Sequence, residues 1–555
     1  RLQGVEEPMR SRRVAIWLAV STTVALLAGA CGGSGNGAGG SGIDRSDATI
    51  SIYVTEPENP LVPGNSTETG GGRVVEALFT GLVEYDPRTG EPRNAVASSI
   101  EATDSTVYTI TLNDGWTFHD GTPVTAKSFA DAWNYTAYSP NGQQAASFFT
   151  QIQGFDQVNT QDPDGPDGPR QAPQPAATEM SGLRVIDDRT LEVTLAEPFS
   201  VFPTQLGYAA FAPLPETFFA DRAAFEANPI GNGPFRFVSR QPGVNIMVER
   251  YENYAGTAKP SVRAVEMRVY ASVEAAYQDV VAGNLDFMEI IPSSALAGKL
   301  FETDLPGRSA SETYLGLQTL SFPVYDPRFQ NPALRQAISM AIDREAVNQQ
   351  IFNGLKPPAD GYVAPDVPGR VPDQCGELCT YQPERAKQMF DATGFPGPIE
   401  LTSNVDAGNQ EWMQAVCTTI RNALARECNF VPVPTFGEFR AAANAHEMTA
   451  IYRSGWVADY PSIENFLNPQ YRTGGSSNDG LYSNPAVDAK LAQADAAPSV
   501  EQGNALYQEA ERMALADMPA IPVYFQSVQS GWSERLDNVI VDPFRRLDLF
   551  SVTVS

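Results

Sequence analysis

Histidine is nearly absent from this chain, which has only His119 and His446 among its 555 residues. Two histidines exclude a site in which several imidazoles of one chain hold a metal ion. His446-Glu447 begins like the zinc-peptidase motif, but Ala450 stands where that motif has its second histidine. The sequence therefore predicts no metal site.

Other enzyme signatures are missing as well. The chain has no Gly-x-Ser-x-Gly turn for a hydrolase nucleophile and no Gly-x4-Gly-Lys-Ser/Thr loop for nucleotide phosphates. We therefore expect that the protein is not an enzyme and carries no cofactor. Any ATP hydrolysis on which it depends takes place in a partner.

Positive charge is also scarce. The chain has 38 Lys and Arg against 66 Asp and Glu, a formal net charge of −28. Nucleic acid requires clustered basic residues, so we expect no nucleic-acid partner. Electrostatic docking on anionic lipid is disfavoured for the same reason, and a solvated acidic surface is the simplest explanation. The length is sufficient for at least two domains.

The apolar stretch near the start of the chain is short. Val14–Leu27 has no charge, but it is shorter than a membrane-spanning helix requires. The basic segment Met9–Arg13 precedes it, and Ala28–Ala30 follow. This pattern predicts a secretory signal peptide over residues 1–30.

Cys31 stands directly after the predicted signal peptide. The arrangement resembles a bacterial lipobox, whose cysteine is acylated, for example with palmitate, and becomes the new N-terminus. Ala28 stands where that motif usually has leucine, and ordinary cleavage beside an unmodified cysteine is the alternative. Residues 31–43, rich in glycine and serine, would form a flexible tether. We expect a lipid-anchored protein on the extracytoplasmic face of the cell membrane.

Four further cysteines remain, an even number in a chain predicted to be exported. Such a context favours disulfides. Proximity in the sequence suggests Cys375 with Cys379 and Cys417 with Cys428, although four cysteines allow three pairings. A metal site is the competing interpretation, but Cys375-x3-Cys379 has no histidine nearby.

Strand-like and helix-like segments alternate along the rest of the chain, which indicates a mixed α/β protein. Thr125 is a plausible helix N-cap, and Phe129, Ala132 and Trp133 would form the buried face of its helix. Residues 161–177, rich in proline, glycine and aspartate, predict an exposed loop. The other clear segments are strands over Ala48–Tyr53 and Val107–Leu112 and a helix over Gly70–Glu84.

A series of short motifs spans more than four hundred residues. The segments are Glu76–Leu82, Trp116–Ala126, Val185–Leu191, Gly231–Phe235, Asn331–Ile338, Ala341–Arg344, Gly455–Pro461 and Ser483–Asp488. In their order and spacing they resemble family 5 of the bacterial extracellular solute-binding proteins, the oligopeptide-, dipeptide- and nickel-binding receptors of ABC importers. One departure is Asn232, where the family usually has threonine between the two glycines.

The resemblance implies a two-lobed α/β fold of the periplasmic-binding-protein type (type II, cluster C) with ligand held between the lobes. Lobe I would be discontinuous, from residues 44–312 and 526–555, with an extra subdomain near 90–225. Lobe II would comprise residues 313–525. Hinge strands would lie near 310–315 and 524–528, where a few backbone torsions absorb closure.

The same resemblance implies a ligand site for short peptides. In peptide-binding relatives the aspartate of the Gly-Trp-x-x-Asp segment pairs with the ligand's α-ammonium, and Asp459 occupies that position. A solvated loop carboxylate is the alternative for Asp459. Leaving the ammonium buried without a partner would cost roughly 3–5 kcal/mol.

Five other residues complete the predicted site. Arg453 matches a position where a relative places an arginine near the ligand carboxylate, and Trp456 offers a broad aromatic face. A surface arginine and a core tryptophan are the alternatives. Tyr460 adjoins Asp459, and Thr67 and Glu68 lie where lobe I of the family approaches the ligand.

The predicted function is that of a membrane-tethered receptor that captures short peptides and delivers them to a permease. Its partners would be the ABC permease subunits and their ATPases, and we expect a monomer. Two alternatives stay open. The same fold could carry haem, a metal chelate or another solute, or the protein could be a regulatory envelope lipoprotein without transport.

Overall fold

The computed structural model describes residues 48–160, 172–405 and 409–555. The predicted signal peptide, Cys31, its tether and most of the proline-rich loop lie outside these residues. Within them, none of the helices combines the length and the hydrophobicity needed to cross a bilayer.

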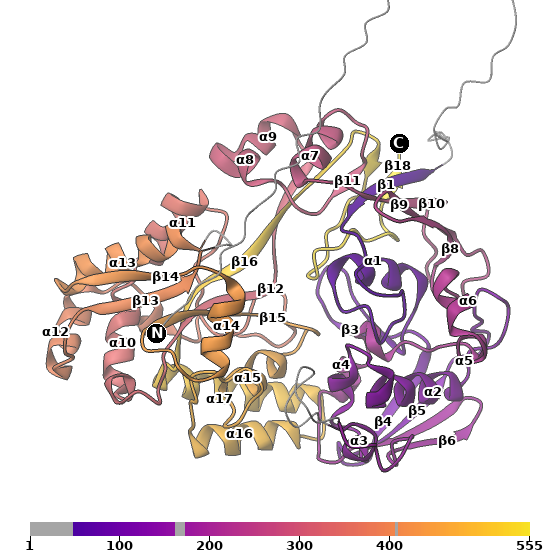
Figure 1. Cartoon of the computed structure of the whole chain (residues 1–555), viewed down its shortest axis with the longest axis horizontal. Coiled ribbons are helices and arrows are strands. Elements are labelled where there is room, and N and C mark those ends of the chain that lie inside the picture. Colours follow the sequence, from indigo (N-terminus) through magenta and orange to yellow (C-terminus); the bar gives the residue numbers. More distant parts are fainter. Residues whose placement is uncertain (1–47, 161–171, 406–408) are drawn as a thin grey trace, which may run out of the picture. The chain divides into compact units, whose positions relative to one another are not determined.

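A ten-stranded mixed sheet runs through the described chain (Figure 1). β1 pairs in parallel with β10, and β13 with β14, whereas β12, β15 and β16 pair antiparallel. In spatial order the strands are β14 (Cys428–Val433), β13 (Ile399–Asn404), β15 (Ile451–Val457), β12 (Ser309–Ser321), β16 (Ala520–Trp532), β11 (Phe287–Met288), β1 (Thr49–Val54), β10 (Ala264–Val269), β9 (Asn245–Arg250) and β8 (Phe235–Gln241).

The central pair of this sheet, β12 and β16, consists of two 13-residue strands that run side by side (Figure 1). Their pairing is irregular at two places. One lies between Gln318 and Thr319 of β12; at the other, Thr313 pairs with Ser527 but Leu317 pairs with Phe525. At this break the Leu315 N–H donates instead to the Pro543 carbonyl, at 3.2 Å. Such irregularities bend a strand locally. The break that begins at Thr313 overlaps the stretches where the sequence predicts hinge strands.

A four-stranded antiparallel sheet forms a separate layer. Its order is β4 (Ala97–Ala102), β5 (Val107–Leu112), β7 (Thr190–Thr194) and β6 (Leu183–Asp187). α2 (Ala126–Ala137) packs on β6 and β7. As predicted, Thr125 is the N-cap of α2, Val107–Leu112 is a strand, and Phe129 and Trp133 are fully buried.

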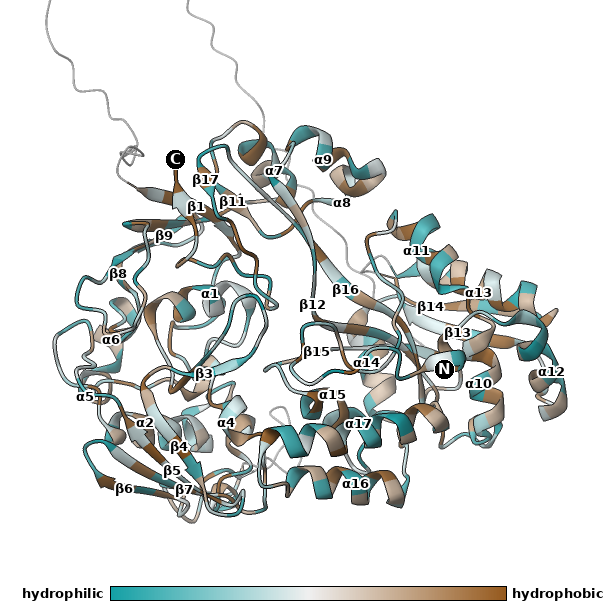
Figure 2. Cartoon of the chain, turned by 180° about the vertical axis from the view of Figure 1, so that it is seen from behind, coloured by the Kyte–Doolittle hydropathy of each residue, from teal (hydrophilic) through white to brown (hydrophobic). Residues whose placement is uncertain are grey.

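Other strands form two small antiparallel pairs, β2 (Val83–Tyr85) with β3 (Pro92–Asn94) and β17 (Leu536–Asp537) with β18 (Thr553–Val554). Helices before β12 are α1 (Thr69–Leu78), α3 (Phe155–Val158), α4 (Phe202–Gln205), α5 (Glu216–Ala220), α6 (Arg222–Ala227), α7 (Val273–Val281), α8 (Ser293–Leu296) and α9 (Leu300–Asp304). Helices after it are α10 (Pro332–Met340), α11 (Arg344–Phe352), α12 (Pro383–Thr393), α13 (Gln410–Leu424), α14 (Phe436–Asn444), α15 (Ile463–Tyr471), α16 (Pro485–Asp495) and α17 (Val500–Asp517). Along α16 and α17, hydrophilic and hydrophobic residues alternate (Figure 2), as expected for helices that bury one face.

The helix predicted over Gly70–Glu84 ends at Leu78, earlier than expected, and Glu84 lies in β2. A distant segment explains the early end. The Gly233 N–H donates to the Leu78 carbonyl at 2.7 Å, and the Asn232 side chain forms hydrogen bonds with both the N–H and the carbonyl of Thr80. A Cβ atom at Gly231 would lie 1.9 Å from the Leu78 oxygen, so this close contact requires glycine.

His119 supports the same segment. Its Nδ1 accepts from the Gly231 N–H at 3.2 Å, and its Nε2 lies 3.1 Å from the Gly233 carbonyl. Burial lowers the pKa of the imidazole to about 4. His119 is thus a neutral structural residue that ties its turn to the segment around Gly231 and Gly233.

Both disulfides suggested by sequence proximity are present. Cys375 pairs with Cys379 and Cys417 pairs with Cys428, with Cα–Cα distances of 5.5 and 5.4 Å. The second bridge joins α13 to β14, so it fixes a helix against the edge of the large sheet.

The C-terminal end of α16 receives hydrogen bonds from residues far away in the sequence. The Ser200 N–H donates to the Asp495 carbonyl at 2.7 Å, and the Ser200 hydroxyl donates to the Ala494 carbonyl at 2.9 Å. The Ser105 hydroxyl donates to the Ala497 carbonyl just beyond the helix. Serine donors therefore satisfy carbonyls that have no partner within the helix.

Candidate functional site

Asp459 lies in the turn between β15 and α15. Its side chain is half-buried, and burial raises the pKa of the carboxyl to about 6, although a hydrogen bond from the Asn465 side chain lowers it. Among the described residues, no lysine or arginine forms an ion pair with Asp459. A desolvated carboxylate without a cation is suited to binding a positively charged ligand group.

The side chains of Trp456 and Tyr460 form hydrogen bonds within the protein. The two residues lie on either side of Asp459 in the sequence. The Trp456 indole N–H donates to Asn465 Oδ1 at 3.1 Å, and the ring is half-buried against the core. The Tyr460 side chain is buried, and its hydroxyl donates to Glu464 Oε2 at 2.7 Å. Both residues therefore support the turn that carries Asp459, while the exposed part of the indole face stays accessible.

Two positive side chains form a second part of the site. Arg453 lies on β15 opposite Leu320 of β12, and Lys356 follows α11. The Lys356 ammonium donates to Gln526 Oε1 at 3.0 Å and lies 4.9 Å from the centre of the Tyr524 ring. Burial, and then the nearby charge of Arg453, lower the pKa of Lys356 to about 8. Two such cations are suited to an anionic group.

Thr67 and Glu68 are not brought into this group. Glu68 is the N-cap of α1, and its Oε1 accepts from the N–H groups of Gly71 and Glu58, both at 3.0 Å. Thr67 is exposed. The residues that line the cavity described next include neither of them, nor any of the other predicted site residues. The structure thus gives Glu68 a helix-capping role.

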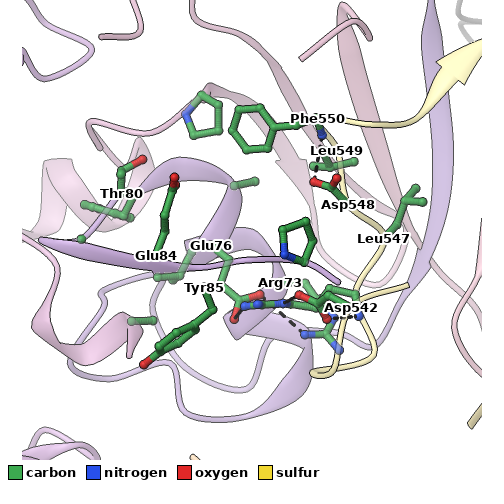
Figure 3. Close-up of a pocket in the computed structure, with 18 of the residues that line it drawn as sticks. Arg73, Glu76, Thr80, Glu84, Tyr85, Asp542, Leu547, Asp548, Leu549 and Phe550 are labelled. Atoms are coloured by element: carbon green, nitrogen blue, oxygen red, sulfur yellow. Dashed lines mark hydrogen bonds and ion pairs between the residues drawn. The ribbon is translucent and has the colours of Figure 1, made fainter. Parts of the chain in front are cut away.

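A cavity of about 220 Å³ lies between α1, β2 and the C-terminal segment 542–550 (Figure 3). Tyr85 and Tyr208 line it, and the pKa of each is raised mainly by burial and additionally by the charge of Asp459. Asp459 is therefore electrostatically coupled to this cavity, although it comes from a distant part of the sequence.

A network of ion pairs forms one wall of the cavity (Figure 3). Arg546 contacts Asp542 and Glu76, both at 2.6 Å, and Arg73 contacts Glu289 at 2.9 Å. Two cations here face three carboxylates, so the paired charges of this wall sum to −1.

The opposite part of the cavity has a different character. Glu84 and Asp548 lie on its two sides, near Phe550 (Figure 3). Arg93 pairs with Glu84 at 3.0 Å, but burial and the charge of Asp548 still raise the pKa of Glu84. Aromatic and acidic groups thus face the same space.

The arrangement can bind a ligand with charge of both signs. Asp459 supplies a negative group two residues beyond β15, and Arg453 on β15 with the nearby Lys356 supplies positive groups. No cluster of three or more His, Cys, Asp or Glu side chains suited to a metal ion occurs in the described part of the chain.

Sequence reasoning missed Asn465 and Lys356. Asn465 lies six residues after Asp459, but only the turn before α15 brings the two side chains together. Lys356 lies far from Arg453 in the sequence, and its surroundings there are those of an ordinary surface lysine. No local signal distinguishes either residue.

Comparison with known proteins gives a consistent result. The family model "Bacterial extracellular solute-binding proteins, family 5 Middle" matches residues 91–478. The oligopeptide-binding protein OppA of Bacillus subtilis (strain 168) is 24% identical, over 96% of this chain and 97% of its own length.

Solved structures share the two-lobed fold. The unliganded open form of the periplasmic murein tripeptide-binding protein MppA has a TM-score of 0.78, with 23% identity over 92% of this chain and 97% of its own. The ABC transporter substrate-binding protein CtaP of Listeria monocytogenes has a TM-score of 0.76, with 18% identity over 92% and 99%. This chain belongs to family 5 of the bacterial extracellular solute-binding proteins.

Proposed function

We propose that this protein is the substrate-binding lipoprotein of an ABC importer and that it captures short peptides between its lobes. The observation that carries the proposal is Asp459, a half-buried carboxylate without a cation partner in the described chain. The names of the relatives, which include oligopeptide- and murein-peptide-binding proteins, support a peptide as the ligand.

In this proposal, lobe I comprises residues 44–312 and 526–555, with a subdomain near 90–225, and lobe II comprises residues 313–525. β12 and β16 cross between them, and the irregular pairing near Thr313 and Leu317 supports a hinge there. The ligand would bind near this crossing, with its ammonium at Asp459.

The sequence around Cys31 supports the remaining part of the proposal. Acylation of this cysteine would hold the receptor at the extracytoplasmic face of the membrane, close to a permease and its ATPases. The glycine-rich linker of residues 32–42 would span roughly 18 Å as a flexible coil, which leaves the lobes free to turn.

The decisive experiment is ligand binding by the purified chain without residues 1–31. A mixture of short peptides is expected to raise the melting temperature, because a ligand at 100 times its Kd stabilises the folded state by roughly 2.7 kcal/mol. N-acetylated peptides should bind more weakly, since they lack the ammonium. Native mass spectrometry of the purified protein identifies what co-purifies. Co-purification of a haem or a metal chelate would exclude the peptide function. So would a folded, ligand-free protein whose melting temperature does not change when peptides are added.

The two cations predict how the other end of the peptide is held. Arg453→Met combined with Lys356→Met is expected to weaken binding of free peptides by at least about tenfold, because a carboxylate loses its charged partners. Calorimetry with C-amidated peptides provides the check. Amidation should lower the affinity of the wild-type protein for the peptide, but it should change the affinity of the double variant little. Equal losses in both proteins would remove these residues from the site.

A further inference from the structure

Asn465 is a buried side chain directly behind the proposed ammonium site. It is the third residue of α15 and only 4% exposed. Ser462 begins the helix by accepting a hydrogen bond from the Glu464 N–H at 3.1 Å, which fixes the first turn. The position of Asn465 is therefore set by the helix N-terminus rather than by the flexibility of a loop.

The side-chain oxygen of Asn465 joins two parts of the site. Oδ1 accepts from the Asp459 N–H at 3.0 Å and from the Trp456 indole N–H at 3.1 Å. One oxygen thus ties the backbone of the ligand-binding turn to the aromatic face beside it. Both donors lie in a region that water reaches poorly, where loss of the acceptor would leave them unsatisfied.

The side-chain amide of Asn465 also acts on two oxygens of the same turn. It lowers the pKa of the Asp459 carboxyl and of the Tyr460 phenol, as a hydrogen-bond donor beside their oxygens does. Among side chains of this length, only asparagine offers both an acceptor and two donors. An aspartate would keep the acceptor but would lose the donors.

We propose that Asn465 is the positioning residue of the ammonium site, which fixes the Asp459 carboxylate and the Trp456 indole in one geometry through opposite ends of its amide. The inference rests on the proposed function, because it assigns Asp459 to the ligand ammonium. Asn465 itself touches no ligand in this assignment. It acts through Asp459.

The surroundings of Asp459 determine how the effect can be measured. The other titratable groups coupled to it are Tyr85, Tyr208 and Tyr460, and burial raises the pKa of all three, so they stay neutral between pH 5 and 8. Glu464 also titrates near this range, since burial raises its pKa to about 7. Glu464→Gln is therefore the necessary control background for any pH profile.

The first test needs no ligand. Asn465→Asp places a second carboxylate beside Asp459 and is expected to lower the melting temperature of the empty protein at pH 7.5. The double variant Asn465→Asp with Asp459→Asn exchanges the positions of the amide and the carboxylate. An amide and a carboxylate then face each other again and can form a hydrogen bond. The double variant should therefore recover most of the lost stability. Additive effects of the two changes would overturn the inference.

The second test uses peptide binding in the Glu464→Gln background. Wild type should bind with nearly constant affinity from about pH 6 to pH 7, below the range in which Lys356 and the ligand ammonium lose their protons. Below pH 6 it should lose about tenfold per pH unit, as Asp459 takes up a proton. Asn465→Asp should move this midpoint upward by at least about one pH unit. The swapped variant should stay stable but bind no better than Asp459→Asn. An unchanged midpoint in Asn465→Asp would overturn the inference. If wild type binds no peptide, the proposed function is wrong, and the stability test alone decides whether Asn465 positions Asp459.

Discussion

Replacing Asp459 with asparagine is expected to remove peptide binding and, at the same time, to stabilise the empty protein. Asparagine has nearly the same shape but no charge, so the ligand ammonium would lose its counter-ion inside a closed site. Truncating one partner of such a pair costs roughly 3–5 kcal/mol, which corresponds to a loss of affinity of more than about a hundredfold. Isothermal calorimetry with a free tripeptide measures this effect.

The gain in stability follows from the pKa of Asp459. Burial raises this pKa from its ordinary value of 3.8 to about 6 in the folded protein. The folded state therefore disfavours the ionised form, and this cost grows as the pH rises from about 4 to 6 and is fully present above 6. After a discount for partial exposure, Asp459→Asn should add roughly 1–2 kcal/mol at pH 7.5 and little at pH 4. A variant that binds peptides normally, or is less stable at pH 7.5, would contradict the assignment.

Replacing Arg546 with methionine is expected to destabilise the protein by roughly 3 kcal/mol. Arg546 forms ion pairs with Asp542 and Glu76, each at 2.6 Å, and Asp542 is only 7% exposed. Methionine preserves much of the side-chain volume but leaves both carboxylates without this partner. Chemical denaturation followed by fluorescence gives the change in the unfolding midpoint.

The neighbouring Arg545 offers a matched control. Its guanidinium lies over the Tyr314 ring at 4.8 Å, and no ion pair of Arg545 occurs among the described residues. Arg545→Met should therefore cost no more than roughly 1 kcal/mol. Equal effects of the two substitutions would show that packing, and not charge neutralisation, determines the stability of this wall.

Features that depend on neighbours in the chain were predictable from the sequence. Val107–Leu112 forms β5, Thr125 caps α2, and the two close cysteine pairs form the disulfides. Each of these follows from a local pattern of side chains or from proximity in the sequence. The family was recognisable because its motifs are short and occur in a fixed order.

Features that depend on distant contacts were not predictable in this way. α1 ends at Leu78 because the segment around Asn232 packs on it, and no pattern near Leu78 reveals that contact. The hydrogen-bond roles of Asn465 and the closeness of Lys356 to Arg453 depend equally on the folded chain. The helix-capping role of Glu68 was not predicted either, since the family resemblance suggested only a ligand contact there, which stays a prediction.

The serine contacts at the end of α16 suggest how the receptor releases its cargo. In the proposed division, Ser105 and Ser200 belong to lobe I and α16 belongs to lobe II. Opening would exchange their hydrogen bonds for bonds to water, and each such exchange changes the free energy by only about 1 kcal/mol. In that division the lobes would be held at this point by contacts that solvent can replace, and these contacts would add little to the cost of opening.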